Sequence, residues 1–352
     1  MKILIISNMY PSKKQPEYAP FIKNIEMALI ENGAEVSKIV IAGKGQSLIE
    51  KAIKYGLFYF KILCVNLKQY DIIHLSYPSH TYWPLLFKRL SSAKLVVRLH
   101  GEDLVESKIK ESIFLQLGRK WFTLPSLRRA KLVVVPSNYF REELKKTGVN
   151  TKAHIYPSGG VNRSILYPNS TPQKKDLFTI GFVGRLGEGK GIEYLLEAVK
   201  NLTFPHKVLI IGNGPLKESL IKRAQRYDLK NVEFLGAIPN QELRTYYNQM
   251  DVFVFPTIME SFGNVGIEAM ACGIPVIGSG ITALKEYIKD GSNGYLFDVG
   301  NVQMLTKKIS AYHSLNKNEQ SQMKKEATLT AEKYDKDILT TRFIKELFSL
   351  TK

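Results

Sequence analysis

Residues 251–275 have the sequence DVFVFPTIMESFGNVGIEAMACGIP, which predicts a strand, a turn and a helix in succession. The apolar run from Asp251 to Pro256 predicts a buried strand, and the run from Ile267 to Cys272 predicts a helix that a glycine and a proline terminate. Glu260 and Glu268 therefore lie on either side of a strand-to-helix turn.

This turn combines features that suit a ligand with both charge and hydroxyl groups. Gly263 and Gly266 allow the backbone to approach a ligand closely, and the positive end of the helix favours an anion such as a phosphate. Carboxylates beside an anion site are suited to neutral hydroxyls, which predicts a sugar nucleotide. Taken alone, however, Glu260 also fits a solvated loop acid and Glu268 an ordinary first-turn glutamate.

A second glycine-rich loop follows the predicted strand at 178–183. It has the sequence GRLGEGKG (residues 184–191) and leads into a helical pattern at 192–202. Backbone N–H groups, the guanidinium of Arg185 and the ammonium of Lys190 suit a pyrophosphate there. The loop matches neither a Walker motif nor the dinucleotide fingerprint, and capping of a surface loop is the alternative interpretation.

Polar residues also follow the predicted strand at 94–99, where His100, Gly101, Glu102 and Asp103 stand in sequence. In parallel sheets such positions gather ligands, so His100 is a candidate to bond a sugar hydroxyl or a leaving oxygen; a structural histidine is the alternative. The remaining histidines lack paired ligand spacing, so no zinc site is expected.

Apolar, β-branched runs alternate with amphipathic stretches along the whole chain. The runs are Lys2–Ser7, Val36–Ala42, Asp71–Tyr77, Lys94–His100, Lys131–Ser137, Phe178–Gly184, Lys207–Gly212, Val232–Leu235, Val252–Pro256 and Pro275–Gly278. Continuous apolar strands indicate parallel sheets covered on both faces, hence two doubly wound, Rossmann-like α/β domains. The polar, proline-bearing segment Asn162–Asp176 is the predicted linker between domains at 1–165 and 166–332.

Composition limits the function classes. The 352 residues suit two domains, and the two cysteines, Cys64 and Cys272, in apolar surroundings offer neither a disulfide framework nor a thiolate metal site, which favours a cytoplasmic protein. The opening apolar run is too short for a signal peptide, and no run is long enough to span a bilayer.

The net charge of +18 is concentrated in the first half, where residues 1–165 carry 26 Lys and Arg against 12 Asp and Glu. Basic and aromatic residues interleave at 51–68 and 108–129, including Phe58, Phe60, Phe114, Trp121 and Phe122. No nucleic-acid fold signature accompanies them, so contact with an anionic membrane on its inner face is preferred over RNA. Packing of the apolar side on the sheet is the alternative.

Together these motifs resemble glycosyltransferase family 4, a group of retaining, nucleotide-sugar-dependent enzymes with the GT-B fold. The resemblance covers nearly the whole chain. It depends most on the glutamates seven residues apart and on the loop at 184–191, with weaker support from His100-Gly101-x-Asp103, from the strand at 232–236 and from Tyr10-Pro11.

The resemblance implies roles for individual residues. Arg185 and Lys190 would hold the donor pyrophosphate with Gly184, Glu268 the ribose, and Glu260 the hydroxyls of the transferred sugar. His100 would face the reacting carbon, Ile238 the base, and Asp103 and Tyr10 the acceptor side. The donor would also meet Phe262, Gly263, Asn264 and Val265, and the C-terminal helix within 333–352 would return to the first domain.

The implied activity is transfer of a sugar from a UDP- or GDP-sugar to a lipid-linked or growing glycan in cell-surface polysaccharide biosynthesis, without a metal or other cofactor, across a cleft between the domains. Departures from the family pattern lie at Ala19-Pro20, Gly159–Asn162 and Gly280-Ile281. Sugar-nucleotide epimerisation, phosphorolysis and a non-catalytic basic module that binds RNA or lipid remain as alternatives.

Overall fold

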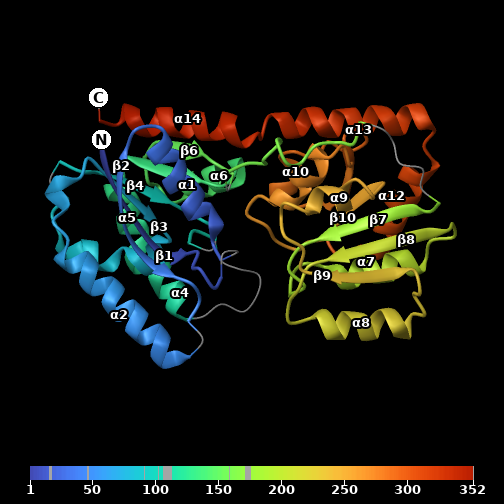
Figure 1. Cartoon of the computed structure of the whole chain (residues 1–352), viewed down its shortest axis with the longest axis horizontal. Coiled ribbons are helices and arrows are strands. Elements are labelled where there is room, and N and C mark those ends of the chain that lie inside the picture. Colours follow the sequence, from blue (N-terminus) through green and yellow to red (C-terminus); the bar gives the residue numbers. More distant parts are fainter. Residues whose placement is uncertain are drawn as a thin grey trace. The chain divides into compact units, whose positions relative to one another are not determined.

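The computed structural model describes all residues except 16–17, 46, 91, 102, 106–112, 158, 171–175 and 352. Glu102, part of the predicted linker and the start of the second basic stretch lie outside the described residues. The chain forms two compact units (Figure 1): Met1–Gly159 with the C-terminal segment from Asp337 onward, here unit 1, and Gly160–Lys336, here unit 2. The observed division falls a few residues before the predicted one at 165.

Unit 1 contains a parallel sheet in the order β2-β1-β3-β4-β5-β6. Its strands are β1 (Lys2–Tyr10), β2 (Glu35–Ala42), β3 (Ile72–Ser76), β4 (Lys94–Arg98), β5 (Leu132–Val135) and β6 (Ala153–Ile155). Its helices are α1 (Pro20–Glu31), α2 (Leu48–Cys64), η1 (Leu67–Gln69), α3 (Pro78–Thr81), η2 (Trp83–Phe87), α4 (Ile113–Gly118), η3 (Arg119–Thr123), α5 (Leu124–Arg129), α6 (Asn138–Lys146) and α14 (Lys336–Ser349). The short strand β6 has no counterpart among the predicted runs.

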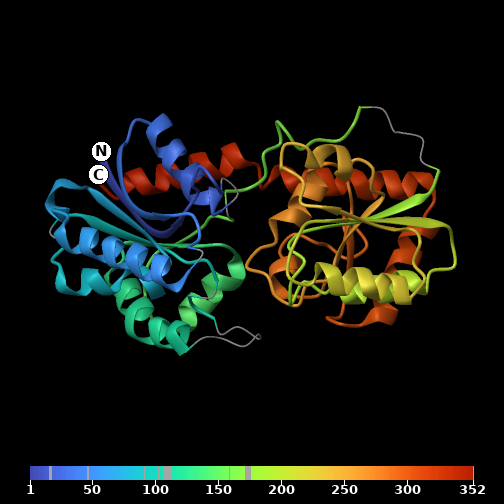
Figure 2. The same cartoon turned by 60° about the horizontal axis from the view of Figure 1, so that its bottom comes forward.

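Helices cover both faces of the unit 1 sheet, as Figure 2 shows with α1 and α14 on one side and α2 on the other. On the α2 side, Leu4, Leu75 and Val97 pack with Phe58 and Ile62 in a continuous core. On the α14 side, the ring of Phe343 contacts the rings of His74 in β3, His154 in β6 and Tyr156 directly after β6. Burial on both faces explains why the strands are uniformly apolar.

Unit 2 repeats this plan with the order β12-β11-β10-β7-β8-β9. Its strands are β7 (Phe178–Val183), β8 (His206–Ile211), β9 (Val232–Gly236), β10 (Val252–Phe255), β11 (Val276–Ser279) and β12 (Gly294–Phe297). Its helices are α7 (Ile192–Lys200), α8 (Lys217–Arg226), α9 (Leu243–Tyr247), α10 (Asn264–Ala271), α11 (Thr282–Lys285), α12 (Val302–Ser314) and α13 (Lys317–Glu332). The predicted pair of doubly wound α/β domains is confirmed.

The strand order contains a switch point in each sheet. In unit 2 the chain runs outward from β7 through β8 to β9, and then returns to the other side of β7 as β10. In unit 1 the same reversal occurs between β1 and β3. Ligands of doubly wound sheets bind beyond the carboxyl ends of the strands at such points, so the loops after β7 and β10 are the expected place for a site.

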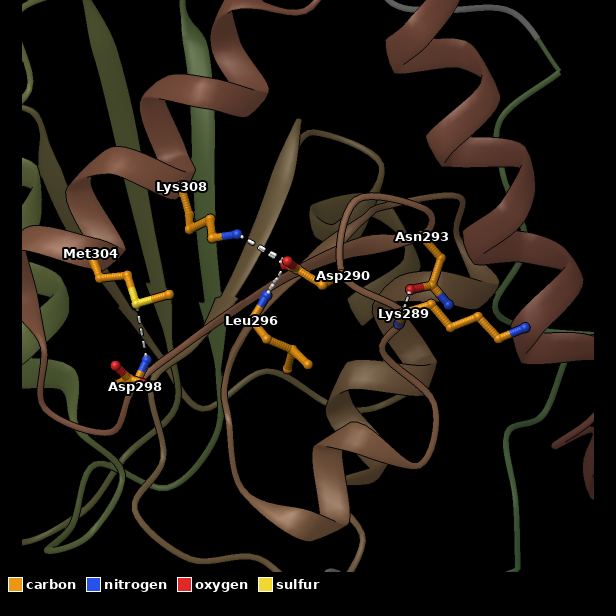
Figure 3. A network of polar contacts seen from close by, with 7 residues as sticks. All are labelled: Lys289, Asp290, Asn293, Leu296, Asp298, Met304 and Lys308. Carbon is orange, nitrogen blue, oxygen red and sulfur yellow. Dashed lines mark hydrogen bonds and ion pairs between the residues drawn. The ribbon is translucent and has the colours of Figure 1, made fainter.

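The edge strand β12, missed in the sequence, is anchored by side chains from the turn before it and from α12 (Figure 3). Asp290 Oδ1 accepts a 2.8 Å hydrogen bond from the backbone N–H of Leu296, and Lys308 Nζ lies 3.1 Å from the same carboxylate. Asn293 Oδ1 accepts a 2.8 Å bond from the N–H of Lys289 within the turn. These contacts satisfy polar groups at an edge that would otherwise be open to pairing with another chain.

Helix α2 leaves much of its apolar surface uncovered. Only Phe58 and Ile62 are buried, whereas Ile49 is 74% and Phe60 63% exposed. Cys64 is exposed, so the expectation of apolar surroundings is correct only for Cys272. No helix among the described residues combines the length and apolar character needed to cross a bilayer.

Candidate active site

The loops after β7 and β10 are held against each other at the switch point of unit 2. Pro256 approaches Gly191 so closely that a Cβ added to the glycine would lie 1.9 Å from the Pro256 carbonyl oxygen. The backbone N–H of Ile258 donates a 2.8 Å bond to the Gly189 oxygen, and Thr257 Oγ1 donates a 3.0 Å bond to the same oxygen. The neighbouring strands thus bring two distant sequence motifs together.

Lys190 and Glu260 meet where these loops touch. The ammonium of Lys190 forms an ion pair with Oε1 of Glu260, and the two side chains keep 27% and 18% of their surface exposed. An ion pair this accessible can be opened by a ligand that supplies an anion for the lysine and hydroxyls for the glutamate. Lys190, the predicted phosphate contact, and Glu260, the predicted sugar contact, are therefore in direct contact with each other.

Glu268 lies on α10, and its carboxylate is bound by polar side chains. Tyr247 Oη donates a 3.0 Å hydrogen bond to Glu268 Oε2, and the side chain of Asn240 also bonds the carboxylate. Burial raises the pKa of Glu268, while both hydrogen bonds act in the opposite direction. The helix begins at Asn264, earlier than predicted, so Glu268 belongs to its second turn.

The start of α10 presents backbone rather than side chains. Gly263 is the N-cap residue, and the first N–H groups of a helix, here from Asn264 and Val265, lack intrahelical partners. Phe262 is buried against Tyr287 and Tyr334, so its ring is part of the core. The prediction that a ligand approaches Gly266 is wrong, because the Tyr287 hydroxyl occupies the space beside this glycine. A Cβ added to Gly266 would lie 2.3 Å from that hydroxyl oxygen.

The remaining predicted donor residues lie on neighbouring strand ends of unit 2. Gly184 directly follows β7, and its N–H bonds the Ile211 oxygen of β8 at 2.9 Å. The side chain of Arg185 is exposed. Ile238, after β9, is partly buried against the core that contains α10. Their positions are compatible with a ligand that extends across the carboxyl ends of the sheet.

His100 and Asp103 occupy the corresponding edge of unit 1. The His100 ring stacks on Tyr77 with centroids 4.0 Å apart, and its backbone N–H donates a 3.1 Å bond to Asp103 Oδ2. Ser79 Oγ donates a 2.6 Å bond to the other carboxylate oxygen of Asp103. Burial lowers the pKa of His100 well below its usual range, with Arg98 and His74 adding to the effect, so the imidazole is neutral.

Tyr10 differs from these two residues, because its hydroxyl is already engaged. It donates to the carboxylate of Glu26 and accepts a 3.0 Å bond from Lys38 Nζ. The ring is buried at the end of β1. The structure thus gives Tyr10 a local role in tying α1 to β2, and its predicted acceptor contact stays a prediction.

Sequence reasoning missed the side chains that orient the candidate residues. Tyr247 and Asn240 bind Glu268, and Tyr77 supports His100. Tyr77 has a backbone φ of 56°, a conformation uncommon outside glycine. No sequence signal marks these partners, since their contacts depend on tertiary packing. Within the described ranges, no three His, Cys, Asp or Glu residues are grouped so that they could hold a metal ion.

Comparisons with known proteins show which family the chain resembles. The family model for glycosyl transferases group 1 matches residues 166–330, and that for Glycosyltransferase Family 4 matches residues 29–159. An uncharacterized glycosyltransferase of Methanocaldococcus jannaschii is 30% identical over 304 residues, which span 85% of this chain and 77% of that protein. A capsular polysaccharide biosynthesis glycosyltransferase, CapM of Staphylococcus aureus, is 35% identical over 144 residues, or 38% of this chain and 36% of that one.

Two solved structures share the fold over almost the entire length. Sucrose-phosphate synthase of Thermosynechococcus elongatus has a TM-score of 0.77 at 19% identity, with 99% of each chain covered. Anabaena HepE, solved in complex with UDP and glucose, has a TM-score of 0.76 at 18% identity, with 99% of this chain and 100% of that chain covered. The fold and the paired loops define a glycosyltransferase of the GT-B class. The chain belongs to glycosyltransferase family 4, and its reaction is sugar transfer.

Proposed function

We propose that the chain is a retaining glycosyltransferase that works without a metal ion or other cofactor. Its donor is a UDP- or GDP-sugar, and its acceptor is a lipid-linked or growing glycan in cell-surface polysaccharide biosynthesis. The observation that carries the proposal is the Lys190–Glu260 pair at the switch point of unit 2, with Glu268 on the adjoining helix. The capsular relative supports the pathway, and the UDP-bound neighbour supports the donor.

The donor would divide its groups among these residues. Its diphosphate takes the cations Lys190 and Arg185 together with the N–H groups at the start of α10. Glu268, held by Tyr247 and Asn240, accepts hydrogen bonds from the ribose hydroxyls. Glu260, released from Lys190, accepts them from the transferred sugar.

Transfer with retention requires the acceptor to attack from the face that the diphosphate leaves. The bond from the anomeric carbon to the phosphate oxygen breaks, and the bond to the acceptor oxygen forms. The acceptor proton passes to the departing diphosphate, whose negative charge Lys190 and Arg185 stabilise. No side chain is then required as a nucleophile, and neutral His100 serves as a hydrogen-bond partner on the unit 1 side.

The test is a transfer assay with a panel of UDP- and GDP-sugars, a lipid-linked acceptor pool and EDTA. We expect transfer in EDTA, a product with the donor's anomeric configuration by NMR, and loss of at least about 100-fold in kcat for Glu260→Gln. Donor conversion without acceptor would instead identify an epimerase, and phosphate-dependent cleavage of a glycan a phosphorylase. Salt-sensitive RNA binding with no nucleotide-sugar affinity would identify a non-catalytic module.

We further propose that α2 places the enzyme on the anionic inner face of a membrane. Ile49, Ile53, Leu57 and Phe60 follow helical spacing and are all exposed. Lys51 and Lys61 are exposed on the same helix. An interfacial helix buries apolar side chains in the lipid while cations contact anionic headgroups, which fits this composition and a lipid-linked acceptor.

A further inference from the structure

Unit 1 contains a buried arginine that has no charged partner among the residues that the structure describes. Arg98, the last residue of β4, is only 3% exposed. Within the part of the chain that the structure describes, its Nη1 has no hydrogen-bond partner. The groups that raise its pKa are the phenols of Tyr156 and Tyr77, which are neutral at ordinary pH, rather than a carboxylate. Burial lowers the pKa of Arg98 to about 10, so the guanidinium still carries its charge.

Further polar groups without partners lie on the same face of the sheet. Ser76 is directly opposite Arg98 in the β3–β4 register, and His74 precedes Ser76 by two residues, so the three side chains share one face. Both ring nitrogens of His74 and Oγ of Ser76 are buried without a hydrogen-bond partner among the described residues. His100 Nε2, two residues beyond Arg98, is also buried without a hydrogen-bond partner among the described residues.

Aromatic rings surround the guanidinium and exclude water from it. Arg98 lies 5.0 Å from the ring centre of Tyr156 and 5.8 Å from that of Phe21. Tyr77 and His100 stack on each other, and both rings are partly exposed, as is that of Phe21. Ring faces attract a cation but replace neither its ion pair nor its hydrogen bonds.

Leaving a charge unpaired inside a protein is expensive, since the penalty is several kcal/mol per ion. The N–H and O–H groups of Arg98, His74 and Ser76 can all donate, and neutral histidine offers one N–H. Donors that share one face of the sheet, with a positive charge that no described carboxylate offsets, suit an oxyanion, which a guanidinium binds through two parallel hydrogen bonds.

We propose that Arg98, His74 and Ser76 form a binding site for one oxyanion, a phosphate or a carboxylate. If the proposed function holds, this group belongs to the acceptor, because unit 2 contains the donor residues. The site lies on strands β3 and β4 of unit 1 and uses none of the donor contacts.

The first experiment measures the thermal unfolding midpoint of the full chain against inorganic phosphate and against acetate, at constant ionic strength. We expect one of the two anions to raise the midpoint of the wild type, which distinguishes phosphate from carboxylate chemistry. The rise should persist in Lys190→Met, whose donor site is weakened, and in Arg128→Met, which removes an exposed arginine of the same unit. It should disappear in Arg98→Met.

Arg98→Met should unfold at the same temperature as the wild type or higher when no anion is present, because it removes an unpaired buried charge. A wild type that responds to neither anion, or an Arg98→Met variant that retains the full response, would overturn the site. If Arg98→Met does not fold, the ring resonances of His74 in the wild type provide the test by NMR. They should shift with the active anion, and unchanged resonances would overturn the proposal.

The acceptor assignment is tested separately with the transfer assay. Arg98→Met should raise KM for the acceptor roughly 10- to 100-fold, the equivalent of losing a charge-assisted bond, with the donor KM unchanged. An unchanged acceptor KM alongside a lost anion response would reject the acceptor assignment and leave the oxyanion site. Failure of the wild type to bind any nucleotide sugar would reject the proposed function alone.

Discussion

The hydroxyl of Tyr247 donates a 3.0 Å hydrogen bond to Oε2 of Glu268, joining the end of α9 to the second turn of α10. The side chain of this tyrosine is fully buried. It therefore fixes the orientation of Glu268 without occupying the surface at which a ribose would bind. Tyr247 is a positioning residue for the proposed donor site.

Tyr247→Phe should raise the donor KM about 5- to 10-fold with little change in kcat, because the loss of about 1 kcal/mol falls on binding. Calorimetry with the nucleotide sugar checks the affinity. Tyr312→Phe is the matched control, since its hydroxyl is also buried in unit 2 and has no partner among the described residues. Equal effects of the two changes on donor affinity would contradict the positioning role.

Lys190→Met should weaken donor binding roughly 10- to 100-fold, since it removes a cation from the proposed diphosphate contacts. Lys207→Met removes a lysine of the same unit that pairs with Glu233, and it should leave donor affinity unchanged. Isothermal titration of both variants makes the comparison. A similar loss in both would indicate a general effect of charge instead of a specific contact.

Gly266→Ala should destabilise the protein by about 1–3 kcal/mol, because the new methyl group would overlap the Tyr287 hydroxyl. Adding Tyr287→Phe should recover part of this loss, although it also removes a 3.1 Å bond to the Gly263 oxygen. Gly56→Ala in α2 meets open space and should be neutral or stabilising by about 0.5–1 kcal/mol. Chemical denaturation of the wild type and these three variants measures these differences.

Stability should fall as the pH decreases from 7.5 to 5.5. Burial lowers the pKa of His74 to about 3, with Arg98 adding to the effect, whereas an unfolded histidine titrates near 6.5. A depressed histidine pKa contributes stability above the unfolded value and loses it as pH falls toward the folded value, here by about 1.4 kcal/mol at pH 5.5. His74→Gln should reduce this slope, and an unchanged slope would show that His74 does not take up a proton on unfolding.

Flotation with vesicles tests the surface of α2. The wild type should rise with vesicles that contain anionic lipid at low salt, and less at high salt. Replacing Ile53, Leu57 and Phe60 by Ser should abolish flotation, because it removes the exposed apolar face. Lys324→Ser and Lys325→Ser, on α13 of unit 2, are the control variants and should leave flotation unchanged. A wild type that stays with the soluble fraction would contradict membrane attachment.

The sequence predicted the elements whose signal is local. Ten strands of the two sheets appear as continuous apolar runs, and β7 with β10 gave the two loops that meet at Lys190 and Glu260. The strands β6 and β12 were missed because their sequences, AHI and GYLF, lack the repeated β-branched residues that mark the similarly short β5 and β10. The start of α10 was placed too late, because Asn264 and Gly266, two residue types common in turns, lie inside the helix.

The surroundings of the site were less accessible to sequence reasoning. The bond from Tyr247 to Glu268 and the stack of Tyr77 on His100 join separate elements, so only the packed chain shows them. Arg98 did leave a signal, a charged residue within the apolar run KLVVRL at 94–99. Charged residues are seldom fully buried without a partner, which makes such a residue worth marking in any strand of this kind.

The contact between Lys190 and Glu260 has a consequence for turnover under the proposed function. A bound nucleotide sugar replaces both halves of the contact, since phosphate meets the lysine and sugar hydroxyls meet the glutamate. The nucleoside diphosphate left after transfer binds only Lys190, so Glu260 competes with the diphosphate for the lysine. The enzyme therefore binds the nucleoside diphosphate product more weakly than the nucleotide-sugar substrate. Between turnovers, Lys190 and Glu260 form their ion pair again and neutralise each other.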